Sequence, residues 1–233
     1  MGTATNGMQE AEGGHGGTEV IPAIASAGIL PALVLEKPTV AVEVAESLIA
    51  GGITVAEVMM RRSGALSAIE AVRSCCMNML VGAGTVLNEK DAADALSAGA
   101  HFIVSPGFDQ RTVEFCIERD TVVIPGVLTP TELQLACNHG LEVIKVFPAD
   151  VSGGPRLIKD LSGPFPMVRF LPTGGINEKN LGGYLAIGSV LAVSGTWITH
   201  RDVIAARDFD EITRRAVESV RLVKQARGGQ ASD

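Results

Sequence analysis

The chain has 233 residues, of which 46% are hydrophobic and 4% aromatic, and its formal net charge is −7 at pH 7. This length allows one sizeable core or two small ones. The acidic balance argues against nucleic acid and anionic membrane surfaces as partners, because both are themselves negatively charged.

The ends of the chain and its potential ligands for metals set further limits. Residues 1–17 are rich in glycine and polar residues and are expected to be a disordered tail, as is the short segment 229–233. No apolar stretch approaches the roughly 20 residues needed to cross a bilayer, and no secretory signal precedes Lys37, the first basic residue. The four cysteines lack CxxC spacing and indicate the free thiols of a reducing compartment, so a cytoplasmic protein is expected. The four histidines form no HxxxH or HxH pair, so neither a metal site nor a cofactor is predicted.

From residue 19 onward, short apolar runs alternate with stretches of helical periodicity. A helix is expected at 19–27, ahead of the first strand. The apolar runs predict strands at 29–35, 55–60, 79–84, 102–105, 122–127, 143–147, 168–172 and 190–194. The stretches between and after them predict helices at 39–50, 65–75, 89–98, 111–119, 131–139, 156–161, 178–187 and 210 to about 227.

This alternation predicts a single α/β domain over residues 18–228, a (β/α)8 TIM barrel with an extra N-terminal helix. The competing arrangement is an open, doubly wound sheet, which would often carry a glycine-rich dinucleotide fingerprint after its first strand. Here the first strand is followed by Glu36, Lys37 and Pro38, without a glycine. The barrel is therefore favoured, and its chemistry is expected at the C-terminal ends of the strands.

Lys145 lies in the apolar run 143–147, which predicts a buried strand. A lysine is almost never buried without a partner or a purpose. Burial disfavours the charged ammonium, and a neutral amine in an apolar pocket is the nucleophile that forms a Schiff base with a carbonyl substrate. Residue type and burial alone leave a structural ion pair with a nearby carboxylate as an equal alternative.

Glu57 is the acid/base candidate, because it places a carboxyl group in the apolar run 55–60. Side chains alternate along a strand, so Glu57 and Arg61 share one face, and Glu57 and Lys145 are expected to point into the same interior. The alternative is a buried ion pair of Glu57 with Lys145 or Arg61 that has no catalytic role. Buried pairs are a poor route to stability, so the catalytic interpretation is favoured.

Two glycine-containing turns, at the ends of the seventh and eighth strands, predict an anion site. Glycines let backbone N–H groups approach an anion closely, the first turn is expected to open a helix whose N-terminus adds donors, and these two loops are the usual phosphate grip of a barrel. The alternative is two tight turns without a ligand. The residues concerned are Thr173, Gly174, Gly175, Ser194, Gly195 and Thr196.

Arg61 and Thr85 are the candidates for binding a substrate carboxylate. A guanidinium binds a carboxylate in a bidentate manner, and the hydroxyl of Thr85 or the N–H groups before it would complete the grip. Arg62 has the opposite parity to Arg61 and is expected to be a solvated surface charge.

Motifs at several of these strand ends together carry a family resemblance. They are VGAGTVL at 81–87, SPG at 105–107, IPG at 124–126, KVFPA at 145–149 and PTGGI at 172–176. In this order, and over most of the chain, the sequence resembles the class I aldolases of 2-keto-3-deoxy-6-phosphogluconate (KDPG) and 4-hydroxy-2-oxoglutarate (KHG).

The resemblance implies a homotrimer of barrels that needs no metal and acts on a small keto acid. It assigns the Schiff base to Lys145 and the proton shuttle to Glu57. It also implies that Arg61 and Thr85 hold the pyruvyl carboxylate, that Phe147 lies beside the Schiff base, that Pro106 lies at the pocket, and that the phosphate turns include Gly174, Gly175 and Thr196. The chain departs from the family at Met59, where threonine is common, and at 194–196, where Gly-Gly-Ser is common.

The predicted reaction is reversible cleavage of a 2-keto-4-hydroxy acid, KDPG or KHG, to pyruvate and glyceraldehyde 3-phosphate or glyoxylate. An oxaloacetate decarboxylase that uses the same lysine is an alternative. So are a phosphosugar isomerase or synthase without a covalent lysine, and a metabolite-binding paralogue in which Met59 has abolished turnover. The sequence alone does not choose between KDPG and KHG.

Overall fold

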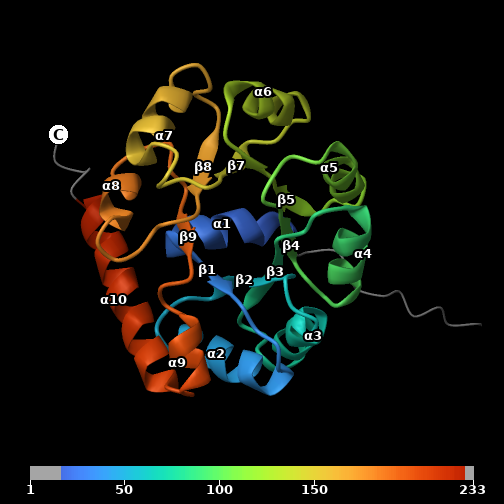
Figure 1. Ribbon diagram of the computed structural model, residues 1–233, viewed down its shortest axis with the longest axis vertical. Helices are drawn as coiled ribbons and strands as arrows, with labels where there is room; N and C mark the ends of the chain where they lie inside the picture. The colour runs from blue at the N-terminus through green and yellow to red at the C-terminus, as the bar shows by residue number, and fades with distance from the viewer. Residues whose placement is uncertain (1–16, 229–233) are drawn as a thin grey trace, which may run out of the picture.

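The computed structural model describes residues 17–228, in which helices surround a central set of strands (Figure 1). The strands are β1 Ile29–Leu33, β2 Val55–Met59, β3 Leu80–Gly84, β4 Phe102–Val104, β5 Val122–Ile124, β6 Gly126–Val127, β7 Val143–Val146, β8 Arg169–Pro172 and β9 Val193–Gly195. The helices are α1 Gly17–Ala27, α2 Pro38–Ala50, α3 Ala65–Cys75, α4 Glu89–Ser97, α5 Gln110–Ile117, α6 Pro130–Asn138, α7 Gly154–Ser162, α8 Leu181–Leu185, α9 Arg201–Ala205 and α10 Phe209–Gly228. The tails expected at 1–17 and 229–233 lie outside the described residues, apart from Gly17, which begins α1.

The strands form two parallel sheets. Six strands make a curled sheet in the order β5-β4-β3-β2-β1-β9, and three make a second sheet in the order β6-β7-β8. Two isolated parallel bridges, Phe170↔Val190 and Thr173↔Ser194, connect the second sheet to the region of β9. Because the strands are parallel, their C-terminal ends all lie at one end of the molecule. The predicted site residues are found at this end.

The single strand expected at 122–127 is instead two short strands, β5 and β6, separated by Pro125. Proline has no N–H to give to a ladder, so it interrupts strand pairing. The carbonyl group of Pro125 still accepts a hydrogen bond of 3.0 Å from the N–H of Lys145. The proline thus ends one sheet and places the next one against β7.

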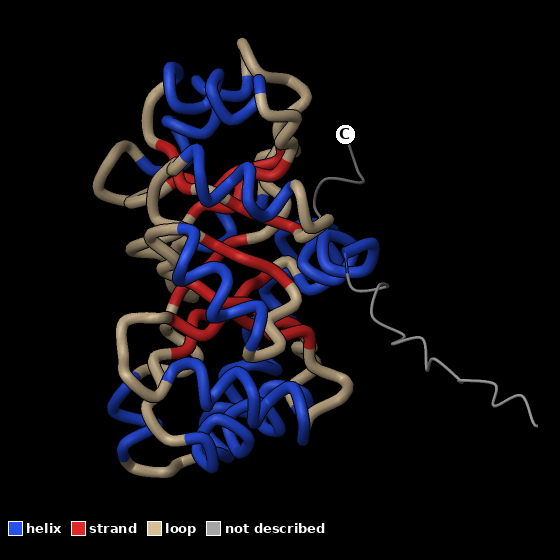
Figure 2. The backbone as a smooth tube through the Cα atoms, turned by 90° about the vertical axis from the view of Figure 1, so that its right-hand side faces the viewer, coloured by secondary structure: helices blue, strands red, loops and turns tan. Residues whose placement is uncertain are grey.

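Helix α1 lies across the middle of the ring of strands in Figure 1 and contributes to one of two apolar clusters. Its Val20 and Ile24 pack with side chains that point into the interior, among them Leu30, Phe102 and Leu171. The larger cluster lies between the strands and the outer helices, and the side view shows the strands inside with helices around them (Figure 2). Since both faces of the strands are covered, their sequences are continuous apolar runs, and all five residues of β1 and of β2 are buried.

Two helices, α8 and α9, depart most from the prediction. The helix expected at 178–187 begins only at Leu181, because the N–H of Asn177 and that of Lys179 bond to side-chain oxygens of Asn180 and Asn177 and form a turn instead. Helix α9, after β9, was not predicted. No helix among residues 17–228 is both long enough and apolar enough to span a membrane.

Candidate active site

The predicted site residues lie on, or directly after, the C-terminal halves of strands in both sheets. Glu57 is on β2, and Ser194 and Gly195 are on β9, all in the six-stranded sheet. Lys145 is on β7, in the three-stranded sheet. The others follow a strand end: Arg61 after β2, Thr85 after β3, Pro106 after β4, Phe147 after β7, Thr173, Gly174 and Gly175 after β8, and Thr196 after β9.

Lys145 is 2% exposed, as its apolar context predicts. Its neighbours in register are Gly126 on β6 and Leu171 on β8, neither of which carries charge. Its Nζ lies 5.6 Å from the centre of the Phe147 ring, and no ion pair within 4.0 Å joins it to a carboxylate of the described residues. The structural ion pair left open by the sequence is therefore not found in this part of the chain.

Glu57 is 0% exposed. Val55, two residues earlier on β2, packs in the apolar cluster that contains Val20 and Ile24 of α1, so Glu57 faces the same interior. Its Oε1 accepts a hydrogen bond of 3.0 Å from Oγ of Ser194. Its Oε2 is buried and makes no hydrogen bond with any described residue. An unpartnered buried carboxylate oxygen is costly, by about 1–3 kcal/mol or more, and it indicates a group kept ready for another partner. Neither Lys145 nor Arg61 forms an ion pair with Glu57.

The segment after β3 makes room beside this carboxyl group. A Cβ atom at Gly84 would collide with Oε2 of Glu57 and would lie 2.8 Å from Sδ of Met59. Thr85 follows with a φ of 58°, which is strained for a β-branched residue. Strain of this kind persists where the surroundings impose it, commonly at functional sites. The hydroxyl of Thr85 donates to Sδ of Met59 at 3.8 Å, so Met59 takes a polar contact as well as filling space.

The two glycine turns meet, but not at a helix N-terminus. Gly174 and Gly175 have φ values of 96° and 81°, which favour glycine. A Cβ at Gly174 would lie 3.3 Å from the Phe147 ring, so this turn runs beside the residue that flanks Lys145. Thr173 is bridged to Ser194, which joins the two turns. The helix expected to open here starts only at Leu181 and has five residues, so the prediction that this turn leads directly into a helix is wrong.

Pro106 packs against the strand next to Lys145. A Cβ at Gly126 would collide with the carbonyl oxygen of Pro106, and Gly126 is the register partner of Lys145 on β6. The side chain of Ser105 donates to the carbonyl oxygen of Gly107 at 2.7 Å and holds this loop. The glycine therefore allows the loop after β4 to approach β6 closely.

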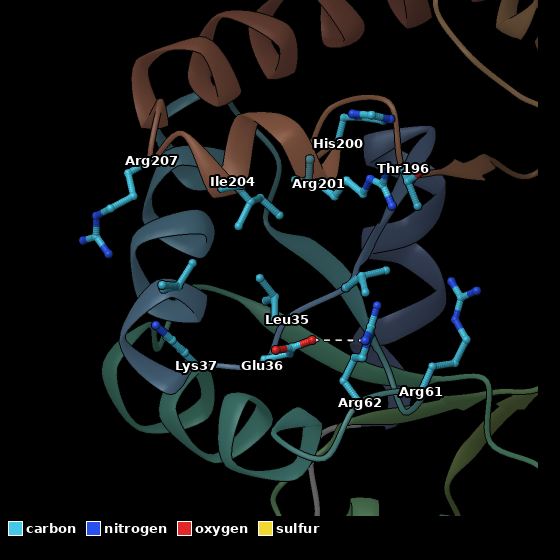
Figure 3. Close-up of a pocket in the computed structure, with 14 residues that line it drawn as sticks. Leu35, Glu36, Lys37, Arg61, Arg62, Thr196, His200, Arg201, Ile204 and Arg207 are labelled. Atoms are coloured by element: carbon cyan, nitrogen blue, oxygen red, sulfur yellow. Dashed lines mark ion pairs between the residues drawn. The ribbon is translucent and has the colours of Figure 1, made fainter.

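A cavity of about 600 Å³ opens between the segments that follow β1, β2 and β9. Figure 3 shows Arg61 and Arg62 on one side of it and Thr196, His200 and Arg201 on another. Of the predicted site residues only Arg61 and Thr196 line this cavity. The buried residues Lys145 and Glu57, and the turn at 173–175, do not.

The cavity wall is strongly basic. Its charged or titratable residues are Glu36, Lys37, Arg61, Arg62, His200, Arg201 and Arg207. Glu36 is paired with Arg62 at 3.2 Å, and Arg207 is paired with Glu43 at 2.6 Å. Lys37 and Arg61 make no ion pair with the described residues. The cavity therefore suits an anionic ligand better than a neutral or cationic one.

Sequence reasoning missed part of this wall. Arg62 is exposed, as expected of a surface charge. It also lines the cavity beside Arg61, as does Lys37, whose part in the wall was not predicted. His200 and Arg201 were missed because α9 was not predicted. The signal that would have found them is their position directly after the eighth predicted strand, at the end where barrels bind ligands.

Comparison with known proteins places this geometry in context. The family model described as KDPG and KHG aldolase matches residues 20–215. The 2-dehydro-3-deoxy-phosphogluconate aldolase of Treponema pallidum is 40% identical over 204 residues, covering 88% of this chain and 97% of that protein. The KHG/KDPG aldolase of Escherichia coli is 41% identical over 196 residues, covering 84% and 92%. The crystal structure of KDPG aldolase from Legionella pneumophila, with pyruvate captured at low pH as a covalent carbinolamine intermediate, is similar with a TM-score of 0.82 and 35% identity, covering 88% of this chain and 97% of that one.

Proposed function

The chain belongs to the KDPG and KHG aldolase family, and from that premise we propose that Lys145 and Glu57 carry out its chemistry. The protein is a carbon–carbon lyase, a class I aldolase that cleaves a 2-keto-4-hydroxy acid to pyruvate and an aldehyde. The observation that carries the residue assignment is the state of Lys145, an amine that is 2% exposed and has no carboxylate partner among the described residues.

Lys145 is the nucleophile. Its uncharged amine attacks the C2 ketone of the substrate and forms a carbinolamine, which loses water to give an iminium ion. Gly126 and Leu171, the register partners of Lys145, and the nearby Phe147 ring carry no charge, so the neighbours of the amine offer it no ion pair. The lone Glu57 carboxyl supplies the proton that the departing water needs.

Glu57 then moves the protons of the cleavage. It removes the proton of the C4 hydroxyl, the C4–O bond becomes a carbonyl, and the electrons of the C3–C4 bond pass to the iminium nitrogen. The aldehyde leaves and an enamine remains. Glu57 returns the proton to C3, and hydrolysis of the resulting iminium releases pyruvate and restores the Lys145 amine.

The remaining residues bind the two ends of the substrate. Arg61 and Thr85 hold the carboxylate next to C2. The backbone of the turns at 173–175 and 194–196, with the hydroxyl of Thr196, holds the anionic group of the aldehyde portion. The basic cavity beyond Arg61 supports a substrate that is anionic at its far end, which fits both the phosphate of KDPG and the second carboxylate of KHG.

The proposal extends to the whole molecule. Residues 18–228 form one domain in which β5 and β6 act as a single broken strand of a closed eight-stranded barrel, with α1 outside the β/α repeat. Hydrogen bonds across both gaps support closure, from Lys145 N–H to Pro125 O at 3.0 Å and from Leu191 N–H to Phe170 O at 2.9 Å. By family resemblance the protein is a cytoplasmic homotrimer, which light scattering of the purified protein and cell fractionation test directly.

Borohydride reduction in the presence of pyruvate tests the residue assignment. The expected result is a stable pyruvyl adduct on Lys145, located by peptide mass spectrometry. Lys145→Ala is expected to lose both the adduct and the cleavage of KDPG and KHG, with an unchanged circular dichroism spectrum. Pyruvate-releasing cleavage by that variant would contradict the assignment, and steady-state rates with the two substrates decide which one is preferred.

A further inference from the structure

The side chain of Ser194 forms a buried hydrogen bond with Glu57, although its position in a glycine-containing turn requires no side chain. Its Oγ donates to Oε1 of Glu57 at 3.0 Å, and both residues are 0% exposed. The two residues are 137 positions apart in the chain. They lie on β9 and β2, which are separated in the sheet by β1. The register partner of Glu57 on β1 is the small Ala32.

This hydrogen bond distinguishes the two oxygens of the carboxyl group. The terminal torsion of a glutamate is broad and nearly two-fold, so packing alone holds it weakly. A hydrogen bond to a charged acceptor is stronger than one between neutral groups, and here it is the side-chain hydrogen bond that Glu57 makes with the described residues. Oε2 is left without a partner, beside the missing Cβ of Gly84.

We propose that Ser194 is a positioning residue for the proton transfers, and that Oε2 is the oxygen of Glu57 that carries the proton. This inference rests on the function proposed above. Oε2 takes the proton from the C4 hydroxyl and returns it to C3 of the enamine, while Oε1 stays bonded to Ser194, whose own hydroxyl proton does not move. The role is separate from the phosphate turn, which uses backbone N–H groups.

Proton exchange at the methyl group of pyruvate measures this step without an aldehyde. In deuterated water, repeated formation and protonation of the enamine replaces the methyl hydrogens, and the rate reports on Glu57. Loss of a hydrogen bond to a charged group is worth about 1.5–3 kcal/mol. Ser194→Ala is therefore expected to lower the exchange rate and kcat roughly 10- to 100-fold, while KM and borohydride trapping of pyruvate remain near wild type.

A double-mutant cycle separates positioning from packing. Glu57→Gln is expected to slow the exchange by about 10²–10⁴-fold, and adding Ser194→Ala is expected to cause no further loss, because the carboxylate that Ser194 holds is already gone. Ser194→Cys retains a small, weak donor, and its exchange rate is expected to lie between those of the wild type and the alanine variant.

Ser189→Ala is the matched control. Its hydroxyl bonds to Oγ of Ser162 at 2.6 Å, away from the site, so its exchange rate is expected to equal that of the wild type. Normal exchange in Ser194→Ala, or losses that multiply in the double variant, would overturn the positioning role alone. Failure of the wild type to trap pyruvate would overturn the proposed function, and this inference with it.

Discussion

At the scale of single residues, the absence of a side chain at position 84 leaves space around the carboxyl group of Glu57, the proposed acid/base group. An added methyl at Gly84 would meet Oε2 of Glu57 and Sδ of Met59. We expect Gly84→Ala to lower the free energy of unfolding by about 1–3 kcal/mol, the usual cost of overpacking, and to lower kcat as well, because the added methyl displaces Oε2 of Glu57. Urea denaturation and steady-state kinetics measure the two effects.

Gly188→Ala is the control for this change. A Cβ at Gly188 would meet nothing within 4 Å, and its φ does not require glycine. Its stability and kcat are expected to stay near wild type. Equal behaviour of the two variants would show that the space beside Glu57 does not matter.

The part of the site that could be predicted from the sequence is the burial of residues whose neighbours in the chain are apolar. Lys145 and Glu57 are charged residues within apolar runs, and both are buried as expected. The bond from Ser194 to Glu57 was not predictable, because it depends on the register of β9 and β2 on either side of β1. The sequence shows the departure from Gly-Gly-Ser at 194–196, but it does not indicate what the Ser194 hydroxyl contacts.

At the scale of elements, most strands and helices begin and end within two or three residues of their expected bounds. The exceptions have local causes that compete with hydrophobic periodicity. Pro125 divides a run that reads as one strand, and the Asn177–Asn180 turn removes the first residues of the expected α8. Helix α9 was missed because its five residues are too few for a periodic pattern.

Helix α5 makes a prediction about thiol chemistry. Burial on its inner face raises the pKa of Cys116 to about 11, so the unreactive protonated thiol predominates well above neutral pH. Cys75, at the end of α3, is exposed. At pH 8 a disulfide reagent is expected to modify Cys75 rapidly and Cys116 only after unfolding, as followed by peptide mass spectrometry.

Replacement of Cys75 by serine controls this experiment, since it should remove the fast phase of labelling. Rapid labelling of Cys116 in the folded protein would mean that α5 opens readily. In that case its packing against the sheet contributes less to stability than the burial indicates.

At the scale of the whole molecule, Arg227 near the end of α10 ties distant segments together. Its two terminal nitrogens donate to the carbonyl oxygens of Ala25 and Leu191, each at 2.6 Å. These oxygens belong to α1 and to the segment before β9. We expect Arg227→Ala to lower the free energy of unfolding by about 1.5–3 kcal/mol, as for other hydrogen bonds from a charged donor, measured by urea denaturation.

Arg221→Ala, on the same helix, is the matched control. Arg221 is paired with Glu218 three residues earlier, and both side chains are substantially exposed. Its loss is expected to change stability by no more than about 0.5 kcal/mol. A similar effect of both substitutions would indicate that the hydrogen bonds from Arg227 to Ala25 and Leu191 add no more to the stability of the fold than an exposed ion pair does.

The division of the strands into two sheets has a consequence for the alignment of the two proposed catalytic groups. Lys145, the proposed nucleophile, lies on β7, and Glu57, the proposed proton carrier, lies on β2, and no direct bond between them sets their separation. That separation is inherited from the two seams, at Pro125 and at the Thr173↔Ser194 bridge. A change of backbone conformation at either seam would therefore alter the distance and orientation between the Lys145 amine and the Glu57 carboxyl, while the immediate surroundings of each group stay the same. Ser194 is paired with Thr173 across one seam and also donates its hydroxyl to Glu57. A shift of the backbone at this seam would therefore move the carboxyl group of Glu57 directly.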